Sequence, residues 1–242
     1  MKGGMEKFDP ARRRFLAGAA ALSAAVLRGK LAPSVEAAER PREAPFAFYG
    51  DVVRVESGKL VDKWKGALPK LDVDLQKLAD AEKNPSPAIA KFERMLSEAR
   101  QHTGLGRVGW VNQGVNLAIK SVPEPKDKDG HYEDKWLSPL QAIERGGDCE
   151  EYAMAKWLGL RRLGVPEQDL YLVIGELADR KRPPATREHM VLAARTEEGW
   201  RMLNDLDHLL LDETDTIELM KPKYYLTREG VFKYVHPRGR PS

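Results

Sequence analysis

Apolar residues recur at helical spacing through the first two thirds of the chain. The clearest case is the segment 88–103, in which five apolar residues fall near one face of a helix. These are Ile89, Phe92, Met95, Leu96 and Ala99. The segments 70–83, 108–119 and 140–144 are also predicted to be helical. In 108–119, the positions expected to point inward are Trp110, Val111, Val115 and Ala118.

A further helix is predicted to begin at Cys149, separated by one residue from the glycine pair Gly146-Gly147. Ala153, Trp157 and Leu160 would share one face of this helix. The sequence Gly-Val-Pro at 164–166 then ends it, because glycine favours the left-handed helix cap and proline cannot continue a helix.

The last third of the chain favours strands. Strand-like segments occupy 170–177, 189–195 and 200–206, and 224–235 is expected to add another. A turn at Glu198-Gly199 would make a hairpin of the second and third segments. Helices followed by an antiparallel meander predict an α+β fold, with a helical N-terminal part packed on the sheet.

The N-terminus reads as an export signal. Arg12, Arg13 and Arg14 lead into an apolar, alanine-rich stretch that is too short for an ordinary membrane span of about 20 residues. This pattern is typical of a twin-arginine signal over 1–37, with periplasmic export; an uncleaved N-terminal anchor is the alternative. We expect a linker at 38–50 and a single domain over 51–242, with no membrane span after cleavage.

The charge of the chain comes mostly from this signal. Residues 1–37 carry a net charge of +4, against +3 for the whole chain, which leaves −1 for the remainder. A slightly acidic domain of about 205 residues gives no argument for nucleic-acid binding.

Cys149 is the only cysteine of the chain. An exported protein with one cysteine cannot use it for an internal disulfide, so a chemical role becomes a serious candidate. A thiolate at a helix start is stabilised by backbone N–H groups and by the helix dipole. A buried core cysteine is the alternative, but the acidic neighbours Asp148, Glu150 and Glu151 do not describe an apolar pocket.

A base and an orienting group follow Cys149 along the chain. His189 begins the second strand, and Asn204 and Asp205 lie on the third. A hairpin would bring the imidazole within hydrogen-bond reach of its partner, and the helix packed on the sheet would present the thiol. This arrangement follows the logic of a catalytic triad.

Several separated motifs resemble one family. They are Gly147-Asp148-Cys149-Glu150-Glu151-Tyr152-Ala153-Met154-Ala155-Lys156, Leu160–Pro166, His189-Met190-Val191-Leu192, Val111–Asn116 and Trp136–Ala142. Over about residues 90–215 the chain is similar to the bacterial transglutaminase-like cysteine peptidases, of which the LapG-type periplasmic proteases are members.

The resemblance implies a papain-like or transglutaminase-like fold and a Cys-His-Asp triad. It also implies cleavage of large surface adhesins that hold cells in biofilms, and control by an inner-membrane receptor that senses a cyclic dinucleotide. The chemistry needs no cofactor, although acidic residues around the cysteine bind calcium in this family. Asp148, Glu150 and Glu151 are the residues expected to do so here. Alternatively, Glu150 and Glu151 complement the positive end of the helix.

The third strand departs from the family pattern. Members usually have Leu-Asp-Asn, whereas this chain has Leu203-Asn204-Asp205. Because adjacent strand residues point to opposite faces, only one of the two is expected to face His189 unless the strand bulges. Asn204 is slightly favoured, Asp205 requires a bulge, and Asp207 comes third.

Other outcomes remain open at the level of sequence. If a lysine amine replaced water, the same site would be a cross-linking transglutaminase. The altered third strand also fits a catalytically impaired domain that binds peptides or partners. Trp157 and Trp200 are expected in the core, while Trp136 suits either the core or the wall of a substrate cleft.

Overall fold

The computed structural model describes residues 44–47, 50–80, 85–123, 128–129, 135–178, 185–206 and 208–235. The chain divides into two compact units, Met1–Arg40 and Pro41–Ser242, and all described residues belong to the second. The predicted export signal, most of the predicted linker and Asp207 therefore lie outside the described residues.

Five long or medium helices precede or flank the sheet: α1 (Lys59–Asp80), α2 (Pro87–Ala99), α3 (Gly104–Ala118), α4 (Pro139–Arg145) and α5 (Cys149–Arg162). Each predicted helix is present. The described part of the predicted segment 70–83 belongs to a longer helix, which begins at Lys59, before Pro69, and ends at Asp80. None of the helices in the described part of the chain is long and apolar enough to cross a membrane.

The early start of α1 follows from its buried stripe. Val61, Trp64 and Ala67 are buried before the proline, and Leu71 and Leu78 are buried after it. Packing of one continuous apolar face therefore outweighs the tendency of an internal proline to break the helix. The indole nitrogen of Trp64 also donates to the carbonyl of Thr227, over 2.7 Å, which ties α1 to the sheet.

One expected inward position in α3 is wrong. Trp110 is 40% exposed and stacks on His102, with ring centroids 5.4 Å apart. The buried stripe of α3 runs through Val108, Val111 and Val115, and a residue next to such a stripe lies about 100° away around the helix. Trp110 therefore lies at the edge of the packed face.

The sheet has seven antiparallel strands in the order β1-β7-β6-β2-β3-β4-β5. Their bounds are β1 (Asp51–Val55), β2 (Leu170–Ala178), β3 (Thr186–Thr196), β4 (Gly199–Leu203), β5 (Leu210–Leu211), β6 (Met220–Thr227) and β7 (Gly230–Val235). The predicted meander is present as β2, β3 and β4. The segment expected to form one strand over 224–235 is instead the β6–β7 hairpin, which pairs with the other side of β2.

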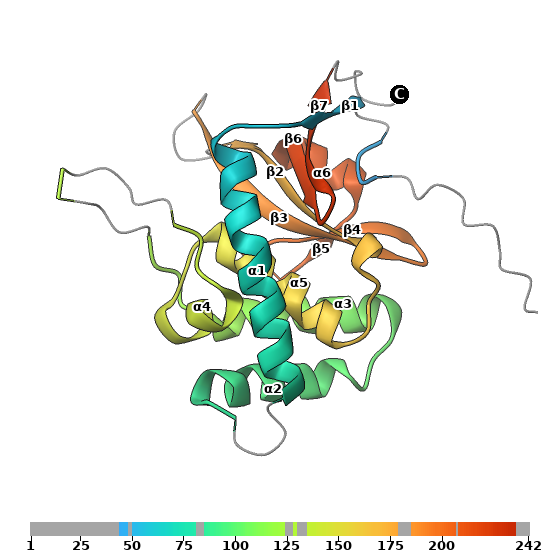
Figure 1. Cartoon of the computed structure of the whole chain (residues 1–242). Coiled ribbons are helices and arrows are strands. Elements are labelled where there is room, and N and C mark those ends of the chain that lie inside the picture. Colours follow the sequence, from blue (N-terminus) through green and yellow to red (C-terminus); the bar gives the residue numbers. More distant parts are fainter. Residues whose placement is uncertain are drawn as a thin grey trace, which may run out of the picture. The chain divides into compact units, whose positions relative to one another are not determined.

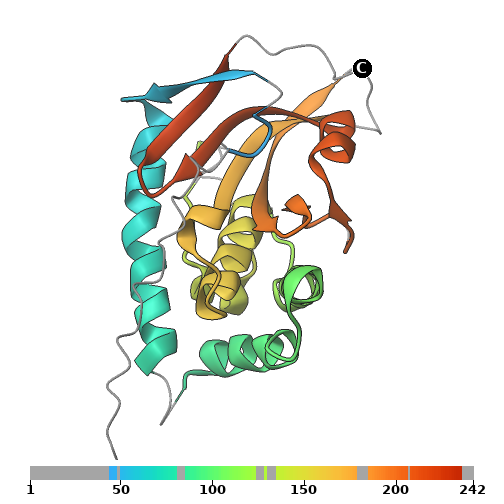
Figure 2. The same cartoon turned by 90° about the vertical axis from the view of Figure 1, so that its right-hand side faces the viewer.

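Helix α5 is the centre of the larger core. It lies beneath the sheet, with α3 and α4 beside it and α1 alongside (Figures 1 and 2). Every residue from Glu151 to Leu160 is buried, as expected for a helix covered on all sides. Trp157 is buried here, which confirms its predicted place. These helices and the antiparallel sheet confirm the α+β class.

The other face of the sheet carries a smaller, aromatic core. Tyr171, Trp200 and Tyr225 pack here, with Tyr171 and Tyr225 stacked at 5.3 Å. Helix α6 (Glu213–Leu219) and the short 3-10 helix η1 (Glu167–Asp169) were not predicted, and neither were β1 and β5. Phe46, within the segment expected to be a linker, is fully buried in this second core.

Candidate active site

Two glycines bring the chain into α5 through a narrow passage. Gly146 has φ of +89°, and a Cβ atom there would lie 2.5 Å from the carbonyl oxygen of Lys120. A Cβ atom on Gly147 would lie 2.6 Å from the Cβ of Glu151. Gly147 also exchanges backbone hydrogen bonds with the strand-like segment at Ser121. Only glycine fits both positions, and the pair fixes where α5 begins.

The first turn of α5 is closed by a capping box between Asp148 and Glu151. Glu151 accepts the backbone N–H of Asp148 over 3.1 Å and that of Leu137 over 2.8 Å. Its side chain therefore fixes the helix start to the segment before α4. These contacts fit the capping role that the sequence left open for Glu151.

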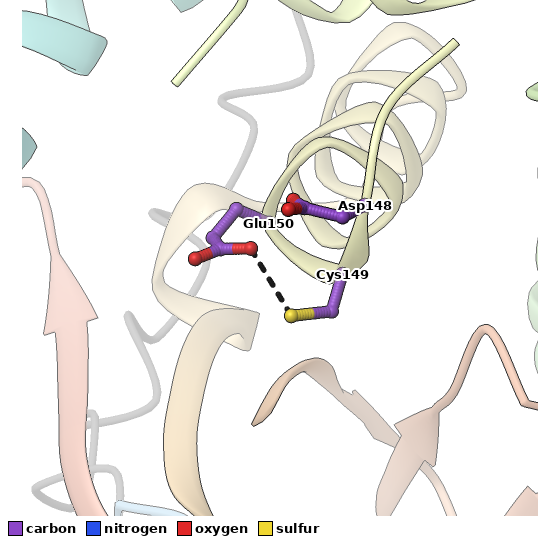
Figure 3. Close-up of side chains that lie close together, drawn as sticks. All are labelled: Asp148, Cys149 and Glu150. Atoms are coloured by element: carbon purple, nitrogen blue, oxygen red, sulfur yellow. Dashed lines mark hydrogen bonds between the residues drawn. The ribbon is translucent and has the colours of Figure 1, made fainter. Parts of the chain in front are cut away.

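Cys149 is the first residue of α5, and its thiol points toward an acidic neighbour. Its Sγ donates a hydrogen bond to Glu150 Oε2 over 3.1 Å (Figure 3). Burial, followed by the charge and hydrogen bond of Glu150, raises the pKa of the thiol far above its usual value. The backbone N–H of Met190 opposes this shift. The thiol in this arrangement is protonated at neutral pH.

Three carboxyl groups gather around the helix start. Ligand atoms of Asp148, Cys149 and Glu150 all lie within 4.8 Å of one another. Burial and the neighbouring Asp148 raise the pKa of Glu150 to about 8 and that of Glu151 to about 7. The group therefore retains protons near neutral pH unless a cation balances its charge. Oxygen ligands of this kind suit calcium. Asp148 and Glu150 are the carboxylates grouped with Cys149, whereas both oxygens of Glu151 already accept backbone N–H groups.

His189 lies on β3, where only 2% of it is exposed, and it pairs with Gly175 of β2. The strand β6 passes so close that a Cβ on Gly175 would lie 2.5 Å from the carbonyl oxygen of Lys221. One ring nitrogen, Nε2, lies 3.1 Å from Asn204 Oδ1 and 3.2 Å from Asp205 Oδ1. The other nitrogen, Nδ1, is thereby left for a different partner.

Asn204 and Asp205 both reach His189, which the sequence did not lead us to expect. The alternation of faces that would separate them holds only inside a strand, and β4 ends at Leu203. Both residues lie in the chain that bends away after it. Asn204 is fixed there, since its Oδ1 accepts Leu206 N–H over 3.0 Å and its carbonyl accepts the side-chain amide of Asn116 over 2.8 Å.

The carboxylate of Asp205 is held in its charged form. Burial acts to raise its pKa, but the hydrogen bond and charge of His189, together with the charge of Lys156, outweigh burial and lower it. Asp205 therefore brings a negative charge to the imidazole, whereas Asn204 brings a neutral acceptor.

A pocket of about 390 Å³ joins these groups. It is lined by Lys63, Ser121, Asp148, Cys149, Glu150, Arg187, Glu188, His189 and Asp205. The structure thus brings the predicted cysteine, histidine and aspartate to one cavity. No motif in the sequence indicated Lys63, Ser121 or Arg187. Trp136 is 5% exposed and packs beneath Lys63, whose Nζ lies 5.4 Å from its ring centroid.

Comparisons with known proteins bear on the family and the fold. The model of a family described as bacterial transglutaminase-like cysteine proteinase matches residues 85–223. Calcium-bound LapG of Legionella pneumophila is 23% identical with a TM-score of 0.51, over 70% of this chain and 91% of that one. EGTA-treated LapG of the same organism is 24% identical with a TM-score of 0.49, over 66% and 84%. A search of the curated proteins finds no match. The first structure confirms the predicted transglutaminase-like fold.

Proposed function

Since the chain belongs to the bacterial transglutaminase-like cysteine proteinases and is therefore a cysteine peptidase, we propose that it cleaves its protein substrate with Cys149 as nucleophile and His189 as base. The observation that carries this proposal is the pocket shared by Cys149, His189 and Asp205. His189 is oriented there through Nε2 by Asn204 and Asp205.

The first half of the reaction is acyl transfer to the thiol. His189 takes the Cys149 proton through Nδ1, because Nε2 is engaged with its two acceptors. The thiolate sulfur attacks the peptide carbonyl carbon, and the carbonyl oxygen becomes an oxyanion. The backbone N–H of Cys149, at the positive end of α5, is the donor placed to stabilise it. The C–N bond then breaks, and His189 returns its proton to the leaving amine.

The second half releases the acyl group. Water loses a proton to His189 and attacks the thioester carbonyl, and the C–S bond breaks to free the carboxylic acid and the cysteine. Imidazolium forms in both halves, and the charge of Asp205 stabilises it. Asn204 keeps the ring in position, since its side-chain Oδ1 accepts the Leu206 N–H and its backbone carbonyl accepts the side-chain amide of Asn116.

Calcium fits the acidic group at the start of α5. Asp148 and Glu150 would hold it, and the ion would supply positive charge where these carboxylates face the thiol. Support comes from the oxygen-rich donor set and the raised pKa values of Glu150 and Glu151. The solved structure of LapG with calcium bound is consistent with this assignment.

The family resemblance also supports a proposal about where the protein acts, on which substrate, and under what control. We infer export to the periplasm by the twin-arginine signal at 1–37, a mature domain over 51–242, a large surface adhesin as substrate, and an inner-membrane receptor as regulator. Two candidates compete with hydrolysis: transfer of the acyl group to a lysine amine, and peptide binding without catalysis.

Incubation of the purified mature protein with the N-terminal region of a candidate adhesin tests the reaction. New N-termini in the adhesin support hydrolysis. Cross-linked bands with release of ammonia favour the transglutaminase reaction instead. Binding of the adhesin without either product, unchanged in Cys149→Ala, favours the non-catalytic module.

A further inference from the structure

Lys156 is a buried cation that the proposed reaction does not use. It lies on α5, seven residues after Cys149, and is 0% exposed, among the largest fully buried side chains of the described residues. Lysine is almost never fully buried unless its charge is compensated. A residue needed only to fill this space would be apolar, so the charge itself requires an explanation.

The position of Lys156 along α5 directs it toward the site. Seven residues span about two turns, so Lys156 shares a side of the helix with Cys149 and Tyr152. Its Nζ lies 5.8 Å from the centroid of the Tyr152 ring. That ring is fixed, because the Tyr152 hydroxyl donates to the carbonyl of Ile119 over 2.8 Å. The ammonium is therefore held over an aromatic face, which favours the charged form.

Among the described residues, Asp205 is a negative charge that interacts with Lys156. The charge of Lys156 acts to lower the pKa of the Asp205 carboxyl. After the effect of burial, the charge of Asp205 raises the pKa of Tyr152. Asp205 therefore interacts electrostatically with both Lys156 and Tyr152. The same carboxylate lies 3.2 Å from the imidazole of His189, so it faces His189 while it interacts with the buried ammonium.

We propose that Lys156 is a positioning residue, whose buried ammonium balances the charge of Asp205 and keeps its carboxylate against His189. A carboxylate buried without a cation would take up a proton or move toward water. In either case His189 would lose the anion that faces Nε2. The consequence for catalysis rests on the proposed function, whereas the pairing of charges does not.

A double-mutant cycle with Lys156→Met and Asp205→Asn tests the inference, because each single change leaves one buried charge and the double change leaves none. We expect Lys156→Met alone to lower kcat/KM by about tenfold or more and to lower the urea midpoint of unfolding. In the Asp205→Asn background, the same change should alter kcat/KM less than about twofold and raise the midpoint.

Lys91→Met is the matched control, since Lys91 donates to the carbonyl of Ala118 away from the site. Its effects should be the same with Asp205 and with Asn at that position. Equal losses from Lys156→Met in both backgrounds would overturn the inference and assign Lys156 to packing alone. If Lys156→Met does not fold, the unfolding midpoint of the double variant is compared with that of Asp205→Asn. A lower midpoint in the double variant would also overturn the inference.

Measuring both kcat/KM and the urea midpoint of unfolding separates this inference from the proposed function. Absence of proteolysis in the native protein contradicts the proposed function, while the unfolding midpoints still measure the coupling between Lys156 and Asp205. Additive midpoints in an active protease contradict only the inference.

Discussion

The thiol of Cys149 donates its hydrogen bond to the carboxyl group of the adjacent residue, Glu150, over 3.1 Å. A nucleophile at a helix start gains from the helix dipole, but this acidic neighbour acts in the opposite direction. The resting thiol is consequently protonated and weakly nucleophilic, which gives the first prediction.

Glu150→Gln should speed alkylation of Cys149 by iodoacetamide. Glu150 has a pKa raised to about 8, so it is ionised mostly above that pH, and there its charge disfavours the thiolate. The gain should therefore be largest above pH 8 and about tenfold or more. Rates are measured between pH 6 and 9, with the exposed Glu144→Gln as control. Equal rates in all three proteins would contradict the assignment.

Loss of either reacting group should abolish turnover. Cys149→Ala and His189→Ala remove the nucleophile and the base, and we expect kcat/KM to fall by about a thousandfold or more. Circular dichroism and urea unfolding establish that both variants are folded. Proteolysis by folded Cys149→Ala would show that another group is the nucleophile.

Asn204 and Asp205 should share the work of orienting His189. Each contacts the same ring nitrogen, at 3.1 and 3.2 Å, so Asn204→Ala and Asp205→Ala should each lower kcat by about 10-fold to 100-fold. The double variant should lose more than either single variant. If one substitution accounts for the whole loss and the other has no effect, a single acceptor orients the ring.

Calcium should raise the melting temperature through the acidic group at the start of α5. A ligand that binds only the folded state stabilises it by mass action, and EGTA should reverse the gain. Asp148→Asn, which keeps a capping side chain, should reduce the calcium-dependent shift, whereas Glu144→Gln should leave it unchanged. A shift of the same size in Asp148→Asn would locate calcium elsewhere.

Glu93 should give the fold a pH-dependent contribution away from the site. Burial opposes its ionisation, but Arg100 and Arg162 outweigh burial and lower its pKa. A carboxyl whose pKa is lowered by folding stabilises above its unfolded pKa, and this contribution is lost as pH falls through the folded value. Glu93 is 24% exposed, so Glu93→Gln should cost less than about 1 kcal/mol at pH 7.

The difference between Glu93→Gln and the native protein should shrink as pH falls below the ordinary pKa of a glutamate, and it should disappear once the carboxyl is protonated in both the folded and the unfolded state. Urea unfolding at several pH values measures it, with exposed Glu98→Gln as the reference. A gap that stays constant with pH would assign the loss to packing.

Residue type and order were enough to place Cys149 at a helix start and His189 on a strand. Cys149 is the first residue of α5, as predicted, whereas β3 begins at Thr186, three residues before the predicted start at His189. Both Asn204 and Asp205 contact His189 because β4 ends before them, at Leu203. A strand end is set by backbone hydrogen bonds to other strands, so the sequence could not fix it within one residue.

Long-range contacts account for the other differences. Lys156 looks like one more polar residue in a helix, and only the packing of α5 on all sides makes it a buried charge. Trp110 and Val111 are adjacent and both apolar, and the spacing of apolar residues alone does not show which of the two faces the core. Strand β1 pairs with β7 across a long sequence separation, Asp51 with Val235, and its valines do not alternate with polar residues as they would in a half-buried strand.

Lys63 shows that part of the pocket wall lies outside the segment that matches the family model. It lines the cavity from α1, whereas the matched segment starts at residue 85 and ends at 223, inside β6. Asp74 of the same helix accepts the backbone N–H of Leu140, over 2.9 Å, and so holds the start of α4. A protein cut back to the matched residues would keep the proposed nucleophile and base but lack one wall of the chamber in which they meet substrate.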